Sequence, residues 1–497
     1  MIKLDFGSFP DPENSRLSCI EGVAKMGEKT RVPLNVVVLG ASFSGLSVVH
    51  HFLDHTVATL GKTSIAPEYR LVIISPSTHI YWNIAAPRAL VGPGLLRDSD
   101  MFVPIEPGLR RHKGANVVFI QGLASGWDTG ARTIQIQAIG PRAQKRASRL
   151  DGTATDGVQE KFTIRYHALI IATGSSTHSD LLSLHGPHTK TMNALKANHE
   201  RLKEASSIVI AGGGPSGMES SSGSLRAAVS LPCTGVEVAG QLATYLNQKP
   251  KRRPWALFST SLSKQRKLNA TTDPKHITLI MATPRALPRL PANIGRKAEK
   301  QLQGLRVKVI KDVRVIDTID DFGEQGKIKV LLSNDQSLLT DVYIAATGVS
   351  PNTAFAPSNL LDAGGYINTN PQTLRVEEAG ERVYAIGDCA SYSANCVLDA
   401  YIGVAPLMSN VQKDLWAWEL RSANPYGGSE DEIRSKEDAN LTRRDKNETQ
   451  LCPITRRGGV GILFGFGLPS LVVHLAKGRD YRVSKGERVV ANGDNPY

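Results

Sequence analysis

Long apolar runs are missing from this sequence. No stretch reaches the roughly 18–20 consecutive apolar residues that a membrane-spanning helix requires, so we predict no transmembrane helix. The N-terminus also lacks the apolar run of a secretory signal peptide, and Asp5, Asp11 and Glu13 argue against an acid-poor transit peptide. We therefore expect a cytoplasmic protein that is not secreted, with a location at the periphery of a membrane or mitochondrion left open.

Cysteine is scarce and scattered: the chain has 5 cysteines among 497 residues. An odd, widely spaced set fits a reducing compartment better than a disulfide framework. The sequence has no C-x-x-C or C-x-x-x-x-C pair, and a dithiol relay needs two neighbouring thiols. The sequence thus disfavours enzymes that pass electrons through a local cysteine pair.

Acidic residues are outnumbered by basic ones, and the formal net charge is +13. A basic protein can bind nucleic acid or anionic lipid. No zinc-finger, RRM, KH or helix-turn-helix signature accompanies the charge, however. We interpret the excess as a solvated surface and do not expect nucleic acid as a partner.

What the sequence does have is glycine after short apolar strands. Residues 35–39 read N-V-V-V-L, typical of a buried parallel strand, and G-A-S-F-S-G follows before a helical stretch. Strand, tight glycine turn and helix form the context of a dinucleotide-binding loop. Gly40 permits the turn, Gly45 lets helix and strand pack closely, and the helix directs free N–H groups at a pyrophosphate. Ser42 replaces the middle glycine of the pattern, so a plain strand-to-helix turn is the alternative.

The second strand, residues 71–74, should end in an acid that holds an adenosine ribose. Ser75 stands there instead, and a serine hydrogen-bonds a ribose hydroxyl less strongly than a carboxylate. The spacing from Gly40 exceeds the usual ~20 residues, and a polar extension at residues 56–69 accounts for the excess.

A second buried strand, residues 207–211, runs into a second glycine loop that reads G-G-G-P-S-G. Two such loops on one chain are much more specific than one. A protein with two dinucleotide sites usually moves a hydride between two cofactors.

The helix after this second loop is interrupted. Residues 220–224 read S-S-S-G-S, a poor helix, whereas residues 234–242 read as the helix that should have begun at Ser216. Removing residues 216–233, which are 18 residues (233 − 216 + 1), or residues 217–234 restores an unbroken loop and helix. We hypothesise that the segment is a retained short intron, with a true loop insertion as the alternative. Abundant coding sequence for it in mature transcripts would refute the intron.

The next strand, residues 277–281, also ends without an acid, and Arg285 follows it. An acid there would favour NADH, whereas a nearby arginine suits the 2′-phosphate of NADPH. The residues therefore favour NADPH, and the alternative for Arg285 is a solvated surface charge.

Three closing motifs complete the pattern. Residues 169–174 and 342–348 are apolar strands that both end in A-T-G, and residues 383–388 read V-Y-A-I-G-D. The A-T-G strands resemble the crossings between the FAD and NAD domains of flavoproteins. In that superfamily the aspartate that matches Asp388 hydrogen-bonds the ribityl chain of FAD; a bare helix N-cap is the alternative.

The motif order resembles pyridine-nucleotide-disulfide-type flavoproteins without the disulfide. It is most similar to the apoptosis-inducing-factor-like mitochondrion-associated family that includes the ferroptosis suppressor protein, in its fungal branch. The resemblance covers residues 35–492 and includes Y-W-N-I-A-A-P-R at 81–88, L-P-R-L-P at 287–291 and the tail at 458–480. It implies an FAD-carrying NAD(P)H-dependent quinone reductase, with some relatives acting at membranes or lipid droplets. Residues 400–412 show no A-Q-x-A-x-Q-like quinone motif, so the quinone is implied by resemblance alone.

The expected fold is α/β, with two Rossmann-like dinucleotide-binding domains, for FAD and NAD(P), the second inserted in the first, plus a C-terminal segment. The expected parts are an FAD domain at 35–190 and 345–400, an NAD(P) domain at 206–344 with a looped-out insertion at 216–234, and a C-terminal region at 401–497 with a flexible linker at 422–450. Residues 1–34 form an N-terminal extension. We hypothesise that translation begins at Met26, and a peptide from residues 1–25 in the native protein would refute this. The apolar run at 462–475 is expected to be a core element rather than a membrane contact.

These motifs and the resemblance assign residues to two cofactor sites, and no metal site is expected. The FAD site is assigned Gly40, Ala41, Ser42, Phe43, Ser44, Gly45, Ser75, Arg88, Leu123, Thr173, Gly174, Gly387 and Asp388. The NAD(P) site is assigned Gly212, Gly213, Gly214, Pro215, Gly235, Glu237, Arg285 and Gly348. We expect Arg88 to stabilise charge on the flavin or the pyrophosphate, with a surface salt bridge as the alternative.

The expected activity is hydride transfer from NADPH or NADH to FAD, followed by electron transfer to a small-molecule acceptor that is quinone-like. The flavin carries this chemistry, and no side chain needs to act as a nucleophile. One alternative is an NAD(P)H-sensing redox signalling flavoprotein with low turnover. Others are a secondary-metabolism oxidoreductase with a different acceptor, and an inactive product if the split loop is real.

Overall fold

The computed structural model describes residues 32–151, 161–212, 233–247, 273–322, 326–424, 438–441 and 449–496. The predicted translation start at Met26, most of the proposed insertion and much of the predicted linker lie outside these residues.

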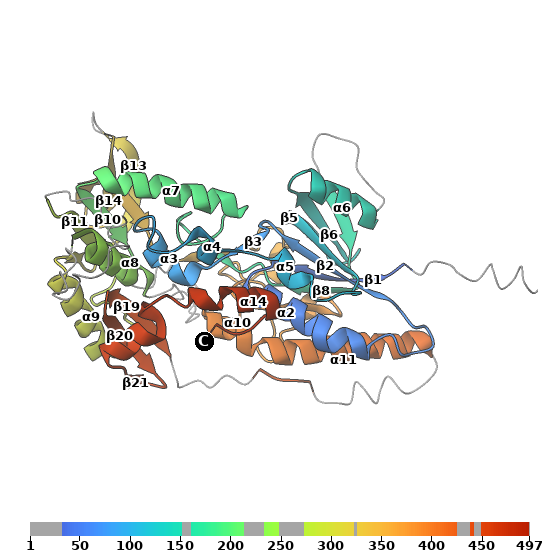
Figure 1. Cartoon of the computed structure of the whole chain (residues 1–497). Helices are drawn as coiled ribbons and strands as arrows, with labels where there is room; N and C mark the ends of the chain where they lie inside the picture. Colours follow the sequence, from blue (N-terminus) through green and yellow to red (C-terminus); the bar gives the residue numbers. More distant parts are fainter. Residues whose placement is uncertain are drawn as a thin grey trace, which may run out of the picture.

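A seven-stranded sheet of order β18-β8-β1-β2-β5-β6-β7 forms the first part of the fold (Figure 1). Its strands are β1 (Leu34–Leu39), β2 (Tyr69–Ser75), β5 (Val117–Asp128), β6 (Thr133–Ala138), β7 (Lys161–Arg165), β8 (Ala168–Ile171) and β18 (Val383–Ala385). The strands β18, β8, β1, β2 and β5 run parallel, and β5, β6 and β7 pair antiparallel. The helices around it are α2 (Phe43–His51), α6 (Pro141–Asp151), α10 (Val397–Ile402) and α11 (Val404–Ala423).

A four-stranded parallel sheet of order β12-β11-β10-β16 forms the second part. Its strands are β10 (Ser207–Ala211), β11 (His276–Ile280), β12 (Lys308–Ile310) and β16 (Val342–Ala345), with helices α8 (Thr234–Leu242) and α9 (Ala292–Gly304). An antiparallel sheet of β13 (Val315–Phe322), β14 (Lys327–Leu332) and β15 (Ser337–Thr340) accompanies it. Because β18 follows this sheet in sequence but joins the first sheet, the second unit is inserted in the first. The predicted fold class is confirmed.

Apolar β-branched residues explain the central strands. Val36, Val37 and Val38 of β1 are fully buried, as are the residues of β8. Such continuous apolar runs belong to parallel strands that are buried on both faces. The register aligns Leu39 of β1 with Ile74 of β2 and with Ile171 of β8, so the carboxyl ends of three neighbouring strands meet where the first glycine loop begins.

Further elements accompany the two units. They are β3 (His79–Tyr81), α3 (Ala86–Ala89), α4 (Asp98–Met101), β4 (Phe102–Pro104), α5 (Glu106–Leu109), β9 (Ser175–Thr177), α7 (His188–Glu204) and β17 (Val349–Pro351). Asn198 and His199 of α7 hydrogen-bond the carbonyls of Leu90 and Ala89, at the end of α3. The helix between the units is thereby fixed to the first unit.

The C-terminal segment contacts both units. Its elements are β19 (Gln450–Thr455), β20 (Gly458–Leu463), β21 (Phe466–Gly467), α13 (Ser470–Val473) and α14 (Gly486–Asn492). The strand β19 packs so closely on α8 that a Cβ on Gly240 would lie 2.5 Å from the carbonyl oxygen of Ile454. The other end lies beside α2, where Ser47 Oγ donates to Gly493 O at 2.7 Å. Figure 1 shows this segment in red, running from the second unit to α2.

Two stretches of the C-terminal third have contacts that the sequence did not predict. Within the predicted flexible linker, Asp438 accepts from Arg375 at 2.7 Å and from Lys413 at 2.8 Å, and Leu441 is buried. Half-buried ion pairs hold Asp438 against Arg375 and against Lys413 of α11. The apolar run at 462–475 is not simply a core element either. It buries Ile462 and Val473 but exposes Leu463, Phe464, Phe466, Leu471, Val472 and Leu475, which we call the C-terminal apolar patch.

Among the helices that the structure describes, we find none with both the length and the apolar composition needed to cross a bilayer.

Candidate cofactor sites

The first glycine loop is built by close backbone contact. Gly40 has φ +102°, and a Cβ there would lie 2.2 Å from the carbonyl oxygen of Ala172. A Cβ on Gly45 would lie 2.0 Å from Gly40 O. Only glycine fits either position. Ser42, the N-cap of α2, makes no side-chain capping hydrogen bond, so its hydroxyl does not occupy the first N–H groups of the helix. This backbone geometry fits a pyrophosphate at the start of α2.

Ser75 lies directly beside this loop. The N–H of Gly40 donates to Ile74 O at 2.7 Å, which places the end of β2 next to the turn. The Ser75 side chain is buried, and its oxygen has only a long contact of 3.5 Å with the N–H of Ser77. Leu123 lies on β5, two residues beyond Gln121, the register partner of Ser75, and is 44% exposed. Both positions are at the carboxyl edge of the sheet, where nucleotides bind in such folds.

The acidic motif packs against the first turn of α2. Gly387 has φ +76°, and a Cβ there would lie 2.3 Å from Ser44 Oγ. Among the described residues, Asp388 accepts two long hydrogen bonds, from Ser175 at 3.4 Å and from Ser393 at 3.5 Å. Its carboxylate therefore keeps acceptor capacity for a polyol such as a ribityl chain. The alternative of a bare N-cap is wrong, because Cys396 is the N-cap of the next helix, α10.

Burial, and secondarily the charge of Asp399, raises the pKa of Asp388 from 3.8 to about 6. Between about pH 4 and pH 6 the native flavin-free protein therefore holds a proton that the unfolded chain has lost. Its stability should fall as pH rises through this window. We expect Asp388→Asn to remove this dependence and to make the flavin-free protein more stable at pH 7, by on the order of 1–3 kcal/mol. Urea unfolding at pH 4 and pH 7 measures this.

The same substitution should weaken FAD binding about 10- to 100-fold, because a charged hydrogen-bond acceptor is lost. Titration of flavin-free protein with FAD measures the affinity. If the variant has the FAD affinity and the pH dependence of stability of the wild type, Asp388 is not part of the FAD site.

The second glycine loop repeats the geometry of the first. Gly212 has φ +125°, and a Cβ there would lie 2.0 Å from the carbonyl oxygen of Ala346. A Cβ on Gly235 would lie 1.4 Å from Gly212 O. Gly40 and Gly45 make the same two contacts. Gly213, Gly214 and Pro215 lie outside the described residues.

The two loops differ in spacing by the length of the proposed insertion. Gly40 and Gly45 are 5 residues apart (45 − 40), whereas Gly212 and Gly235 are 23 apart (235 − 212). The difference of 18 equals the length of residues 216–233. Helix α8 begins at Thr234, as predicted, so Gly235 takes the place of the third glycine of the loop. Whether the 18 residues are a retained intron stays a hypothesis for transcript sequencing.

The paired A-T-G motifs have two structural roles. The carbonyl groups of their alanines, Ala172 and Ala346, contact Gly40 and Gly212 respectively. Beyond the turns, β9 and β17 pair antiparallel, with Thr177 opposite Val349. The residue after β17 also contacts the first turn, since Asn352 Nδ2 donates to Thr173 O at 3.0 Å. Gly174 and Gly348 both have positive φ, +66° and +126°. The crossings between the two units therefore lie side by side, next to both loops.

Arg285 lies in the turn after β11, the strand next to the second glycine loop. Its Nη2 donates to Pro288 O at 2.6 Å, and the side chain is half-buried. The N–H of Gly212 donates to Ile280 O at 2.9 Å, which brings the end of β11 to the loop. Arg285 thus lies in the turn at the strand end where the predicted contact with a ribose phosphate would be made, and that contact stays a prediction.

Arg88 and Glu237 both bind residues of the C-terminal segment in this structure. Arg88 is 4% exposed, so the surface salt bridge considered for it is wrong. Its guanidinium donates to Gln241 Oε1 and to the carbonyls of Gly478 and Arg479, and it lies over the ring of Tyr481. Glu237 is buried and accepts from Lys477 Nζ at 2.7 Å. Both side chains point to partners that are remote in sequence.

Two loops of the same build, joined by paired crossings and accompanied by a buried aspartate, define a two-dinucleotide oxidoreductase of the flavoprotein class. A family model described as Pyridine nucleotide-disulphide oxidoreductase matches residues 34–410, and the chain belongs to this family. The prediction of FAD and a reduced pyridine nucleotide as its cofactors is thereby confirmed.

Several known proteins are similar over most of the chain. Oxidoreductase phnG of Penicillium herquei is 34% identical over 454 residues, which cover 90% of this chain and 93% of that protein. Oxidoreductase ptaL of Pestalotiopsis fici is 31% identical over 363 residues, 72% of this chain and 78% of that protein. The sulfide:quinone oxidoreductase of Aquifex aeolicus shares the fold with a TM-score of 0.56 at 14% identity, covering 93% of each chain.

The sequence did not assign the two alanines, Ala172 and Ala346, whose carbonyls complete the loops. Their repetition in the A-T-G motifs was the signal that could have identified them. Lys477 had no such signal, because its partner Glu237 is 240 residues away in the chain.

Proposed function

We propose that this chain is an FAD-dependent NAD(P)H oxidoreductase whose electron acceptor is a quinone-like small molecule, as in the apoptosis-inducing-factor-like family. The observation that supports two cofactors is the duplicated loop geometry, Gly40 with Gly45 and Gly212 with Gly235, beside paired crossings. The quinone-like acceptor is supported by the family resemblance alone. When bound, the two cofactors supply hydride transfer from nicotinamide to flavin and onward electron transfer.

The residues of the chain hold and orient these groups. The Gly40 loop and the N-terminus of α2 would hold the FAD pyrophosphate, Ser75 would hydrogen-bond the adenosine ribose, and Asp388 would accept from the ribityl chain. The Gly212 loop and the start of α8 bind the nucleotide of NAD(P)H. Because β9 and β17 pair beside both loops, the crossings keep the two sites at a fixed spacing, which hydride transfer requires.

Steady-state turnover tests the acceptor. We expect purified protein to oxidise NADPH or NADH with a water-soluble ubiquinone analogue at 1 or more turnovers per second, on the scale of about 1–10³ per second typical of enzymes. Flavin that is reduced by NAD(P)H but passes electrons to no quinone would contradict the quinone. Turnover below about one per minute with every acceptor would favour the NAD(P)H-sensing alternative. Rapid turnover with a different small molecule would favour the secondary-metabolism alternative.

Arg285 should set the coenzyme preference. Because its guanidinium lies in the turn after β11, we expect Arg285→Ala to lower kcat/KM for NADPH about 10- to 100-fold while leaving NADH within about threefold, since one charged hydrogen-bonding partner of the 2′-phosphate is lost. Arg289→Ala, an exposed arginine of the same loop, is the matched control. Equal losses for both coenzymes would show that Arg285 is structural.

The C-terminal apolar patch is our proposed site of peripheral membrane contact. Phe464 is 60% exposed and Phe466 78%, the net charge is +13, and a lipid-soluble quinone would be met at a bilayer surface. We expect wild-type protein to sediment with vesicles that contain anionic lipid. The double variant Phe464→Ser/Phe466→Ser should bind about 100-fold less or weaker still, because burial of each such side chain is worth about 1.5–3 kcal/mol.

Ile316→Ser is the control for this experiment, because Ile316 is 67% exposed on β13, outside the patch. Equal vesicle binding by wild type and the double variant would show that the C-terminal apolar patch does not contact the membrane. A monomer–dimer shift in the double variant, without any vesicle binding by wild type, would assign the patch to a second copy of the chain.

A further inference from the structure

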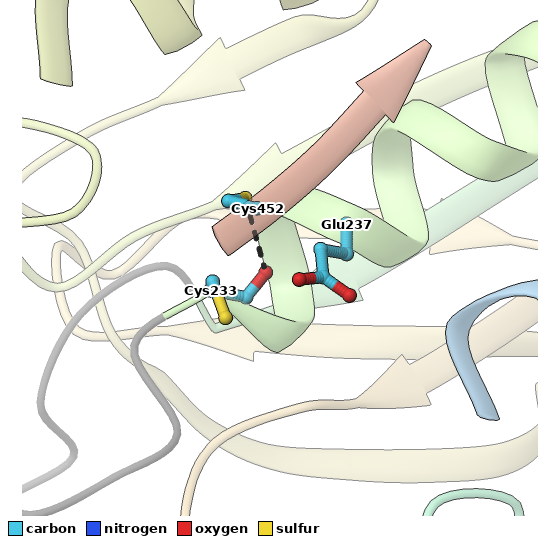
Figure 2. A group of neighbouring side chains, drawn as sticks. All are labelled: Cys233, Glu237 and Cys452. Carbon is cyan, nitrogen blue, oxygen red and sulfur yellow. Dashed lines mark hydrogen bonds between the residues drawn. The ribbon is translucent and has the colours of Figure 1, made fainter. Parts of the chain in front are cut away.

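One cluster outside the cofactor loops combines two thiols with a carboxylate and an ammonium group. Cys233 is the N-cap of α8, Glu237 lies in the first turn of that helix, and Cys452 lies on β19 (Figure 2). The two sulfur atoms and a carboxylate oxygen of Glu237 all lie within 4.8 Å of one another. Cys452 Sγ donates a weak hydrogen bond to Cys233 O at 3.9 Å. The fold thus brings together two cysteines that are 219 residues apart.

The two thiols differ in their surroundings. The pKa of Cys233 is lowered, chiefly because the Cys452 thiol can donate to its thiolate and also because the Lys477 ammonium lies near. Burial raises the pKa of Cys452. Cys233 is partly exposed, whereas Cys452 is fully buried. Cys233 is therefore the thiol that ionises more readily and belongs to the less buried residue, whereas Cys452 is a buried thiol, which is the arrangement expected of an attacking and a resolving cysteine.

The ammonium group argues against a metal ion at the cluster. Lys477 Nζ donates to Glu237 Oε1 at 2.7 Å and to Leu451 O at 3.2 Å, so the carboxylate already has a cation as its partner. A metal ion would lie next to that cation. The cluster also offers three ligand atoms, whereas structural zinc sites use four protein ligands.

We propose that Cys233 and Cys452 form a reversible disulfide, with hydrogen peroxide as the oxidant and Cys233 as the sulfur that it oxidises first. The bond would join the N-terminus of α8 to β19. Thr234 and Gly235 follow directly, and Gly235 contacts Gly212 in the second glycine loop. The disulfide is thus a modification site next to the NAD(P) loop, and its formation does not depend on the proposed acceptor.

The chemistry balances in two steps. The Cys233 thiolate attacks one peroxide oxygen, the O–O bond breaks, and the leaving hydroxide takes a proton to become water. Cys233 is then a sulfenic acid, oxidised by two electrons, and the peroxide has been reduced by two. The Cys452 sulfur attacks the Cys233 sulfur, the S–O bond breaks, and a second water leaves with the Cys452 proton. A dithiol reductant reverses the change and itself becomes a disulfide.

Peptide mapping of the full chain tests the proposal. The protein is treated with one equivalent of hydrogen peroxide, its remaining thiols are alkylated, and it is digested without reductant. We expect one cross-linked peptide that joins Cys233 to Cys452, loss of two free thiols, and recovery of both with dithiothreitol. Cys396→Ser, which removes another partly exposed cysteine, should leave the cross-link unchanged. Oxidation that leaves Cys233 and Cys452 unlinked would overturn the proposal.

A resolving-cysteine variant adds an independent readout. In Cys452→Ser we expect dimedone to label Cys233 after peroxide treatment, because the sulfenic acid has no thiol to attack it. Wild type should label at least about tenfold less, since the disulfide traps the same sulfur. Equal labelling of both proteins would contradict the role of Cys452. Stoichiometric zinc that survives dialysis in wild type and is lost in Cys452→Ser would overturn the disulfide in favour of a metal site.

The proposal applies to the chain that retains residues 216–233. A protein made from a transcript without them would lack Cys233 and leave Cys452 without its partner. The cross-linked peptide is therefore sought in native as well as recombinant protein, and its presence in native protein would refute the retained intron.

Discussion

Replacing Gly40 with alanine is expected to yield protein that purifies without flavin. The new Cβ would lie 2.2 Å from Ala172 O, 2.7 Å from Ala172 C and 3.1 Å from Thr173 N. These are backbone atoms at the end of a buried central strand, so no side chain can move aside to relieve the contact. The φ of +102° adds strain for any residue with a Cβ. The loop must shift, and the N–H groups of α2 shift with it.

The expected loss of FAD affinity is at least ~100-fold, because two or more charge-assisted hydrogen bonds to the pyrophosphate are lost at ~1.5–3 kcal/mol each. The measurement is the ratio of flavin to protein absorbance after purification, followed by titration with FAD. Gly130→Ala is the control, since the nearest atom to its Cβ would be Asp128 Oδ1 at 3.5 Å, an ordinary contact. Thermal unfolding against flavin-free wild type checks that Gly40→Ala folds. Folded Gly40→Ala with full flavin content would contradict the site.

Replacing Gly235 with alanine is expected to impair the NAD(P) site without impairing the FAD site. The variant should keep its bound flavin, but NAD(P)H should no longer reduce that flavin. Its Cβ would lie 1.4 Å from Gly212 O and 2.5 Å from Gly212 C. The start of α8 must therefore move away from the second glycine loop. The first loop is untouched, because Gly40 and Gly45 pack against each other and against Ala172.

We expect the bimolecular rate of flavin reduction by NAD(P)H to fall ~100-fold or more, since a misplacement of ~1 Å costs about that much in an oriented reaction. Anaerobic stopped-flow absorbance gives the rate. Gly304→Ala is the matched control in the same unit, because a Cβ there would have no atom within 4 Å. Normal reduction of Gly235→Ala by both NADPH and NADH would show that α8 does not form the nucleotide site.

Local sequence predicted the parts of this fold that depend on local chemistry. Neighbouring residues determine the buried apolar strands, the glycine turns and the start of α8 at Thr234. These local patterns therefore predicted where both glycine loops lie in the sequence. The A-T-G pair predicted two crossings by its resemblance to flavoproteins, and the structure shows that these crossings lie side by side. The finer assignments of Ser75, Leu123 and Arg285 stay predictions, although their strands end where such contacts are made.

The sequence could not show what the C-terminal segment does. Arg88 reaches the carbonyls of Gly478 and Arg479, Glu237 pairs with Lys477, and Cys233 meets Cys452. Each partner is more than 200 residues away, and no periodicity or motif encodes such contacts. Asp438 looked like one of many charges in a polar stretch, and only the fold places it against Arg375 and Lys413.

Anaerobic mixing of the purified flavoprotein with NADPH, and separately with NADH, tests the central claim most directly. The long-wavelength flavin absorbance should bleach with both donors, and faster with NADPH. Bound flavin that stays oxidised with either donor would contradict a working NAD(P) site in this chain. Deletion of residues 216–233, followed by the same measurement, would then show whether that segment is the cause.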